Sequence, residues 1–222
     1  MSASIKPRVY PAVFIVFIVN TFIMIKEFIY KIWSDFLTWF GKLKIMTFHY
    51  IPVIAADVKP FYLNGYDVLQ IMEILKPGDV LVRGYDCYVD GKFIPDEHGY
   101  SHAGIYVGGQ DIIHAVSPSV CRVSVVDFCQ CDRIMVLRPC YGQEYAIHNA
   151  ETKLGLPYDF NYEGDSEKMY CFELVSHCYE FANLETFEVK KFFGLIKRQC
   201  ILAKSLYQSE FFNKIYEKNN KE

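Results

Sequence analysis

The sequence lacks the features that mark several common classes of protein. It has no run or cluster of Lys and Arg, and its formal net charge at pH 7 is -3 with a pI near 6.1. Nothing in it therefore points to a nucleic-acid partner. Hydrophobic residues make up 52% of the 222 residues and aromatic residues 17%. The chain thus has enough apolar side chains for a sizeable core, and intrinsic disorder is not expected.

The 8 cysteines lack the spacing of a zinc site or of a small disulfide-rich scaffold. Cys129-x-Cys131 is not a common zinc spacing, and no C-x-x-C or H-x-x-x-H pair follows it. A metal site made of His98, His102, His114 and a cysteine would match no usual ligand pattern. We therefore expect no cofactor, and mostly reduced thiols in a reducing compartment.

The N-terminal part has a run without charge, from Val9 to Ile25, between Arg8 and Lys26. At about 17 residues it reaches the lower limit for crossing a bilayer. No small-x-small cleavage motif closes it, so a cleaved signal peptide is the weaker interpretation. The next stretch, Lys26 to Ile45, predicts an amphipathic helix. Its apolar residues recur at helical spacing: Phe28, Ile29, Ile32, Trp33, Phe36, Leu37, Phe40 and Leu43.

We predict that residues 1–48 form a hydrophobic helical segment that spans or lies on a membrane, with residues 9–45 meeting the lipid. Trp33, Trp39 and the neighbouring lysines suit a membrane interface. The lysines after the run weakly favour a cytosolic location for the rest of the chain. The alternative is a pair of buried core helices at the start of a soluble domain.

A β-hairpin with two histidines is predicted in the middle of the chain. The turn Pro77-Gly78-Asp79 precedes a short strand at residues 80–82, and residues 103–107 and 111–116 form two strands joined at Gly108-Gly109. Antiparallel pairing around that turn brings His102 and His114 side by side, so the two rings can share a hydrogen bond. A lone strand histidine is usually structural, but the turn forces this pair together. Residues 135–137 predict a further strand.

A helix is predicted to begin close to Cys171. Its apolar face contains Cys171, Leu174, Val175, Cys178 and Ala182, and the simple interpretation makes Cys171 a small core residue. Its place in the first turn favours another interpretation, because the free N–H groups and the helix dipole there lower a thiol pKa. With an imidazole near, such a thiol can act as a nucleophile, and its own N–H can help to bind an oxyanion.

These segments resemble the NlpC-type papain-like hydrolases, in a different chain order. Pro77-Gly78-Asp79, the stretch Ser101-His102-Ala103-Gly104-Ile105-Tyr106 and Ile113-His114-Ala115 come first, and Gly155-Leu156-Pro157-Tyr158 and Cys171-Phe172-Glu173-Leu174-Val175 come after. That order is a circular permutation. It resembles the permuted YiiX and YaeF-like branch, lecithin:retinol acyltransferase-like enzymes and, above all, the papain-like proteins of poxviruses. The resemblance covers roughly residues 75–184.

The resemblance implies a role for four residues. Cys171 would be the nucleophile, His102 the general base and His114 the third residue that orients the base. Tyr158 matches a tyrosine that lends its hydroxyl near the oxyanion. Glu173 and Asp111 are alternatives to His114 as the third residue; Glu173 is two positions from Cys171 on the helix and should point away from the thiol.

The fold expected from this resemblance is α+β: a permuted papain-like fold with an antiparallel sheet packed on the helix that carries the nucleophile. The catalytic domain would cover residues 49–190. Residues 191–222 show no family motif, and their apolar residues predict a C-terminal helical extension.

We expect a cysteine-dependent hydrolase or acyltransferase that works through a thioacyl-enzyme on an amide, thioester or lipid ester. The N-terminal segment favours a membrane lipid or an acylated or peptidic substrate at a membrane. The alternatives are a peptidase or amidase acting on peptides or cell-wall fragments, and a non-catalytic membrane-anchored binding protein with the same fold.

Overall fold

The structure is a computed structural model, and it describes residues 11–41, 43–48, 51–56, 61–86, 98–164, 167–191 and 196–219. The chain divides into two compact units, residues 1–39 and residues 40–222. The boundary thus lies closer to the N-terminus than the predicted one at residue 48. The seven cysteines among the described residues are all free thiols, and Cys87 lies outside the described residues.

The first unit contains one long helix, α1 (Pro11–Gly41), which covers most of the predicted uncharged run and of the amphipathic stretch. Val9 and Tyr10, the beginning of the predicted span, lie outside the described residues. In the part of the chain that the structure describes, no helix has the length and apolarity needed to cross a membrane. The prediction of helix as far as Ile45 was wrong, because Leu43–Phe48 form strand β1, which pairs with β2 (Ile51–Ala56).

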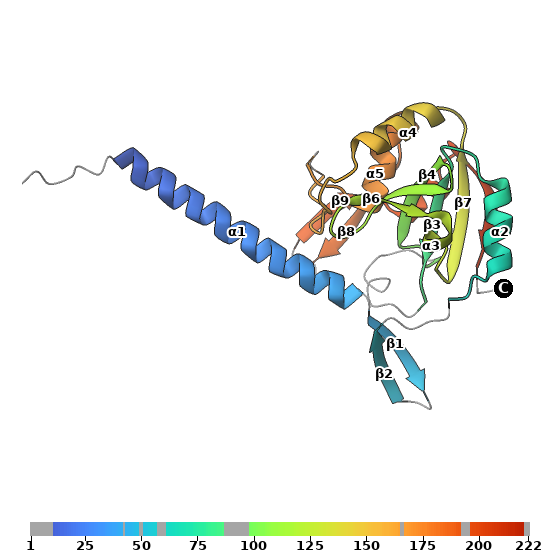
Figure 1. The fold of residues 1–222 in the computed structure, drawn as a ribbon, viewed down its shortest axis with the longest axis horizontal. Helices are drawn as coiled ribbons and strands as arrows, with labels where there is room; N and C mark the ends of the chain where they lie inside the picture. The colour runs from blue at the N-terminus through green and yellow to red at the C-terminus, as the bar shows by residue number, and fades with distance from the viewer. Residues whose placement is uncertain are drawn as a thin grey trace, which may run out of the picture. The chain divides into compact units, whose positions relative to one another are not determined.

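A six-stranded antiparallel sheet is the centre of the second unit (Figure 1). Its strand order is β10-β7-β3-β4-β5-β6. The strands are β3 (Val80–Gly84), β4 (His102–Gly108), β5 (Asp111–Ala115), β6 (Val120–Ser124), β7 (Arg133–Pro139) and β10 (Phe212–Lys218). The predicted hairpin is confirmed, since β4 and β5 pair through Ile105–Ile113 and Tyr106–Ile112 around the Gly108-Gly109 turn.

Helices cover both faces of this sheet (Figure 1). On one side lie α4 (Gln143–Thr152) and α5 (Cys171–Cys178), which contact β4. On the other lie α2 (Gly65–Ile74) and the single-turn α3 (Val125–Phe128). Side chains alternate between the two cores with the period of a strand. Val80 and Val82 join the core under α5, and Leu81 between them joins the core under α2 and α3.

The C-terminal residues are not the predicted helical extension. Strand β8 (Phe187–Lys191) pairs with β9 (Ile196–Cys200), a single short helix α6 (Ala203–Tyr207) follows, and β10 then pairs with β7. The unpaired backbone of a sheet edge is a strong template for another strand. This long-range pairing outweighs the local apolar spacing that suggested a helix.

Gly104 gives His114 and α3 the space that they occupy. A methyl group at this position would lie 2.6 Å from Ile112 Cγ2, 2.9 Å from Phe128 Cε2 and 3.2 Å from His114 Cβ. All three neighbours are buried. Gly104 therefore allows the close approach of β5 and α3 at this point of β4.

We predict that Gly104→Ala lowers the free energy of unfolding by about 1–3 kcal/mol, as overpacking does in a tight core. Chemical denaturation monitored by circular dichroism measures the change. Gly65→Ala is the control: nothing lies within 4 Å of a methyl group there, so its effect should stay within about 0.5 kcal/mol. Equal stability of the Gly104→Ala variant and the unmodified protein would contradict this packing.

Candidate active site

The two histidines form a buried pair at the start of the hairpin. His102 is the first residue of β4, and His114 lies near the end of β5. His102 Nε2 and His114 Nδ1 are 2.8 Å apart, and the rings meet edge to face with centroids 5.0 Å apart. The hydrogen bond predicted from the hairpin is thus present. Since it occupies Nε2 of His102, Nδ1 is the nitrogen that remains for another partner.

Arg83 is the cation next to this pair. It lies on β3 directly opposite His102. Its guanidinium carbon is 4.3 Å from the centre of the Phe128 ring, and Nη1 donates a hydrogen bond of 2.7 Å to the carbonyl of Phe128. Burial lowers the pKa of His114 to about 3, and the charge of Arg83 adds to this effect. Burial, Arg83 and His114 together lower the pKa of His102 well below its usual value. Both imidazoles are therefore neutral near pH 7.

Cys171 is the first residue of α5, as predicted, and it is only 3% exposed. Its thiol lies against the backbone on either side of His102: Sγ is 3.9 Å from the carbonyl oxygen of Ser101 and receives a hydrogen bond from the N–H of Ala103. Burial raises the pKa of the Cys171 thiol to about 11, although the N–H groups of Ala103, Phe172 and Cys171 itself lower it. The expected lowering by the helix start is present, but burial outweighs it.

The thiol and the imidazoles reach the start of β4 from two sides. Cys171 belongs to the core under α5 together with Ala103, whereas both histidine rings contact Phe128 of α3 in the other core region. Among the described residues, no hydrogen bond joins Cys171 Sγ to the His102 ring. The structure therefore brings His102 and His114 together, and it brings Cys171 to the backbone of His102 rather than to its ring.

The other predicted residues lie around this centre. Tyr158 forms a parallel β-bridge with Met169, two residues before Cys171, and its N–H donates to the carbonyl of Pro118 at 3.0 Å. The Gly155–Tyr158 segment therefore runs beside the chain that enters α5. The role of the Tyr158 hydroxyl near the oxyanion stays a prediction.

The two alternatives to His114 lie elsewhere. Asp111 is at the turn end of β5, where its carboxylate lies 3.7 Å from Arg122 Nη1. Glu173 accepts a hydrogen bond from the N–H of Tyr170 and lies 4.0 Å from His177 Nε2. Neither carboxylate is described in contact with His102 or His114, and Glu173 points away from the hairpin, as its place on the helix predicts.

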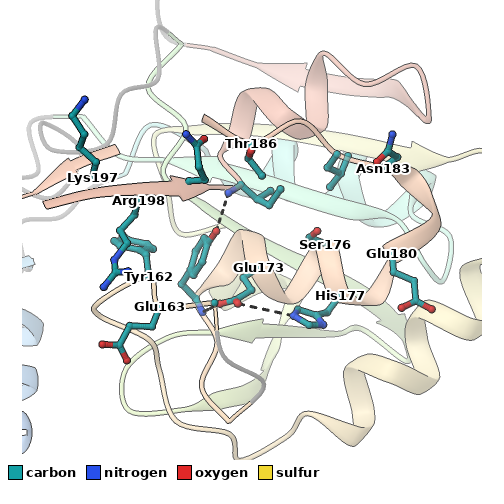
Figure 2. Close-up of a pocket in the computed structure, with 15 residues that line it drawn as sticks. Tyr162, Glu163, Glu173, Ser176, His177, Glu180, Asn183, Thr186, Lys197 and Arg198 are labelled. Carbon is teal, nitrogen blue, oxygen red and sulfur yellow. Dashed lines mark hydrogen bonds and ion pairs between the residues drawn. The ribbon is translucent and has the colours of Figure 1, made fainter. Parts of the chain in front are cut away.

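Glu173 points into a cavity of about 540 Å³ on the outer side of α5, lined mainly by polar side chains (Figure 2). Figure 2 shows Glu173 and His177 facing one another from α5, with Arg198 of β9 and Tyr162 across the cavity. Cys171, His102 and His114 are not among the described residues that line it. Tyr170 lines the cavity and is also the N-cap residue of α5, so it joins the wall of the cavity directly to Cys171 in the chain.

Three residues at this site were missed by the sequence reasoning. They are Arg83, Phe128 and Cys121; the last lies opposite His114 on β6, with Sγ 3.5 Å from His114 Nε2. The alternation of side chains in residues 80–84 could have indicated which face of the sheet Arg83 lies on. Its place opposite His102 also depends on the register of β3 against β4, which the sequence does not fix.

No group of three or more His, Cys, Asp and Glu side chains is placed to hold a metal ion within the described part of the chain. His98, which with His102 and His114 had formed the discarded metal pattern, packs its ring edge to face on Tyr207. It therefore does not join the histidine pair.

Comparisons with known proteins agree with this architecture. The family described as permuted papain-like amidase enzymes, YaeF/YiiX, C92, matches residues 74–216. Protein OPG091 of vaccinia virus (strain Copenhagen) is 30% identical over 127 residues, which cover 54% of this chain and 72% of that protein. Protein OPG091 of monkeypox virus is 30% identical over 128 residues, with the same coverage.

One solved structure has a similar fold. It is the crystal structure of the metalloprotein YiiX from Escherichia coli O157:H7, with a TM-score of 0.54 and 17% identity. The match covers 64% of this chain and 97% of that one. At this identity the likeness concerns the fold alone, and the description as a metalloprotein applies to YiiX.

We predict that alkylation of Cys171 by limiting iodoacetamide is slow at pH 7 and rises about tenfold for each pH unit up to pH 10. Only the thiolate reacts, and a pKa of about 11 leaves the thiol protonated throughout this range. Peptide mass spectrometry measures the rate, with the exposed Cys140 as an internal reference. A rate for Cys171 that is already constant below pH 8 would show that helix start and N–H groups outweigh burial.

Proposed function

The chain belongs to the permuted papain-like amidase family, and from this premise we propose that it is a cysteine-dependent hydrolase of amide bonds. In this proposal Cys171 is the nucleophile, His102 the general base and His114 the residue that orients His102. The observation that carries it is the placement of the Cys171 thiol against the backbone on both sides of His102, whose ring is held by the buried hydrogen bond to His114.

The proposed first step is the attack of Cys171 Sγ on the carbonyl carbon of the substrate. A C–S bond forms and the π electron pair of the carbonyl moves to oxygen, which becomes an oxyanion. The thiol proton goes to Nδ1 of His102, and for this transfer the ring has to come closer to Sγ than in this structure, where Sγ contacts the backbone on either side of His102. Because the pKa of His102 is lowered, its ring is neutral at neutral pH, and in the tautomer that donates Nε2–H to His114 its Nδ1 can accept a proton. The N–H of Cys171, at the start of α5, is a suitable donor to the oxyanion.

The intermediate then loses the leaving amine, which takes its proton from His102. The acyl group stays on Cys171 as a thioester, and His102 removes a proton from the water that releases the acid. If an alcohol or amine replaces this water, the same site transfers the acyl group. Hydrolysis and transfer therefore differ in the acceptor, and acyl transfer on a thioester or lipid ester is the second form of the proposal.

We predict that Cys171→Ala lowers amide hydrolysis at least about 10³-fold and that His102→Ala lowers it about 10²- to 10⁴-fold, the usual contribution of a general base. Acylated coumarin amides, an acyl thioester and phospholipid vesicles serve as substrates, and added hydroxylamine reveals acyl transfer. Mass spectrometry should find the acyl group on Cys171. Cys140→Ser, an exposed thiol outside the site, should remain fully active.

The outcomes separate the candidate functions. Cleavage of the coumarin amides alone supports an amidase or peptidase, and turnover in vesicles supports a lipid enzyme. If the folded protein turns over none of these substrates and forms no acyl-enzyme, the proposal of a hydrolase is refuted for these bonds, and a binding protein with this fold becomes the better interpretation.

We also propose that α1 binds the surface of a membrane. Large apolar side chains of α1 are exposed along one broad side: Phe22, Ile25, Phe28, Ile29, Ile32, Trp33, Phe36 and Trp39. Glu27, Lys31, Ser34 and Thr38 lie on the opposite side at helical spacing, together with the exposed Ile23 and Met24, whereas Asp35 lies beside Phe28. A helix with such faces, with tryptophans among its apolar residues, is typical of interfacial binding. The first unit would then bring the hydrolase to acylated or lipid substrates.

We predict that the full chain sediments with vesicles of phosphatidylcholine and phosphatidylserine. The triple variant Ile29→Ser, Trp33→Ser, Phe36→Ser should bind at least about tenfold more weakly, because each side chain loses most of its apolar transfer free energy. Asp35→Asn, which removes a negative charge and no apolar side chain, is the control and should bind at least as well as the unmodified chain. Equal sedimentation of the triple variant would exclude this side of α1 as the lipid-binding surface.

A further inference from the structure

Cys121 extends the histidine pair across a third strand. It lies on β6 directly opposite His114 on β5, and its Sγ is 3.5 Å from His114 Nε2. His114 Nδ1 is already bonded to His102 Nε2 at 2.8 Å. Both nitrogens of His114 are therefore occupied, and a chain of hydrogen bonds runs from His102 through His114 to Cys121 on three neighbouring strands. The proposed mechanism uses only the first two residues of this chain.

We propose that Cys121 is a positioning residue, which holds His114 in the tautomer that His102 needs when it takes the proton of Cys171. This inference rests on the proposed function for its catalytic meaning. Its structural content is independent: Cys121 decides where His114 carries its proton.

The positions of the protons along the chain follow from the two hydrogen bonds of His114. When His102 holds the thiol proton on Nδ1, it carries a second proton on Nε2, which needs Nδ1 of His114 as its acceptor. His114 is neutral, because its pKa is lowered to about 3, so its single proton must then lie on Nε2. That N–H points to Cys121 Sγ, which has to accept it.

A thiol suits this position because it both donates and accepts hydrogen bonds. Burial raises the pKa of Cys121, so the thiol stays protonated near neutral pH and adds no charge to the chain. Its S–H can rotate. It donates to His114 Nε2 when that nitrogen carries no proton, and it turns away so that Sγ can accept when Nε2 carries the proton. An apolar side chain here could neither donate nor accept. The N–H at Nε2 of His114 would then lack its acceptor in the tautomer that His102 needs in order to act as a base.

The charged and titratable groups that face His114 make this acceptor more important. Arg83 comes from β3, His102 from β4 and Cys121 from β6, and α3 contributes the uncharged ring of Phe128. Arg83 disfavours a positive charge on either histidine. Acceptance by Cys121 is thus the contact at the far end of the chain that favours the protonated form of His102.

The test compares Cys121→Val with Cys121→Thr, two side chains of the same shape of which only threonine can accept and donate a hydrogen bond. Long-range ¹H–¹⁵N spectra of the full chain with labelled histidine report the tautomer of each ring. We expect the threonine variant to keep the His114 proton on Nε2 as in the unmodified protein, and the valine variant to lose that preference. Cys140→Val controls for the removal of a thiol elsewhere.

The second readout is alkylation of Cys171 by iodoacetamide at pH 8. We expect a rate about three- to tenfold lower in Cys121→Val, as for the loss of one hydrogen bond, and within about twofold of the unmodified protein in Cys121→Thr. A loss of packing alone would affect both variants equally. If Cys121→Val does not fold, Cys121→Ala and Cys121→Ser form the corresponding pair.

The two readouts separate this inference from the proposed function. If His102→Ala leaves the alkylation rate of Cys171 unchanged, the proposed dyad fails, but the histidine spectra still decide the role of Cys121. If the spectra of folded Cys121→Val match those of the unmodified protein, Cys121 does not set the tautomer and the inference is overturned.

Discussion

The site depends on one buried hydrogen bond, between His102 Nε2 and His114 Nδ1. Antiparallel pairing around the Gly108-Gly109 turn brings the two strands together, and Gly104 leaves space for Ile112, Phe128 and the Cβ of His114. Once Nε2 of His102 is engaged, its Nδ1 is the only ring nitrogen that can act as a base. The hairpin therefore decides both the position of the imidazole and the atom that can take a proton.

Burial determines the charge state of the site more strongly than the helix start does. A cysteine at the first position of a helix is expected to have a lowered pKa, yet the buried thiol of Cys171 has its pKa raised to about 11. The pKa values of His102 and His114 are lowered for the same reason. The thiol and both imidazoles are thus neutral near pH 7, so in the proposed mechanism attack and proton transfer would occur together.

The sequence predicted the parts of the site that depend on local order, and missed those that depend on register over long separations. The hairpin and the start of α5 follow from a Gly-Gly turn, from strand-like alternation and from apolar residues at helical spacing, all within a few residues of His102, His114 and Cys171. The position of Arg83 opposite His102 requires the register of β3 against β4, across a long loop that carries no signal for it. Strand β10 was mistaken for helix because its pairing partner, β7, lies more than 70 residues earlier in the chain.

Arg83 shifts the pKa values of both histidines and of Cys171. It lies opposite His102, and its charge opposes protonation of both imidazoles while it slightly favours the thiolate of Cys171. A stable thiolate–imidazolium pair is therefore disfavoured at its imidazolium end, and the proton stays on sulfur until a carbonyl approaches. In the proposed mechanism the half-buried Arg83 would also attract the oxyanion when it forms, because a charge is less screened there than in bulk water. The new negative charge would then offset part of the cost of protonating His102.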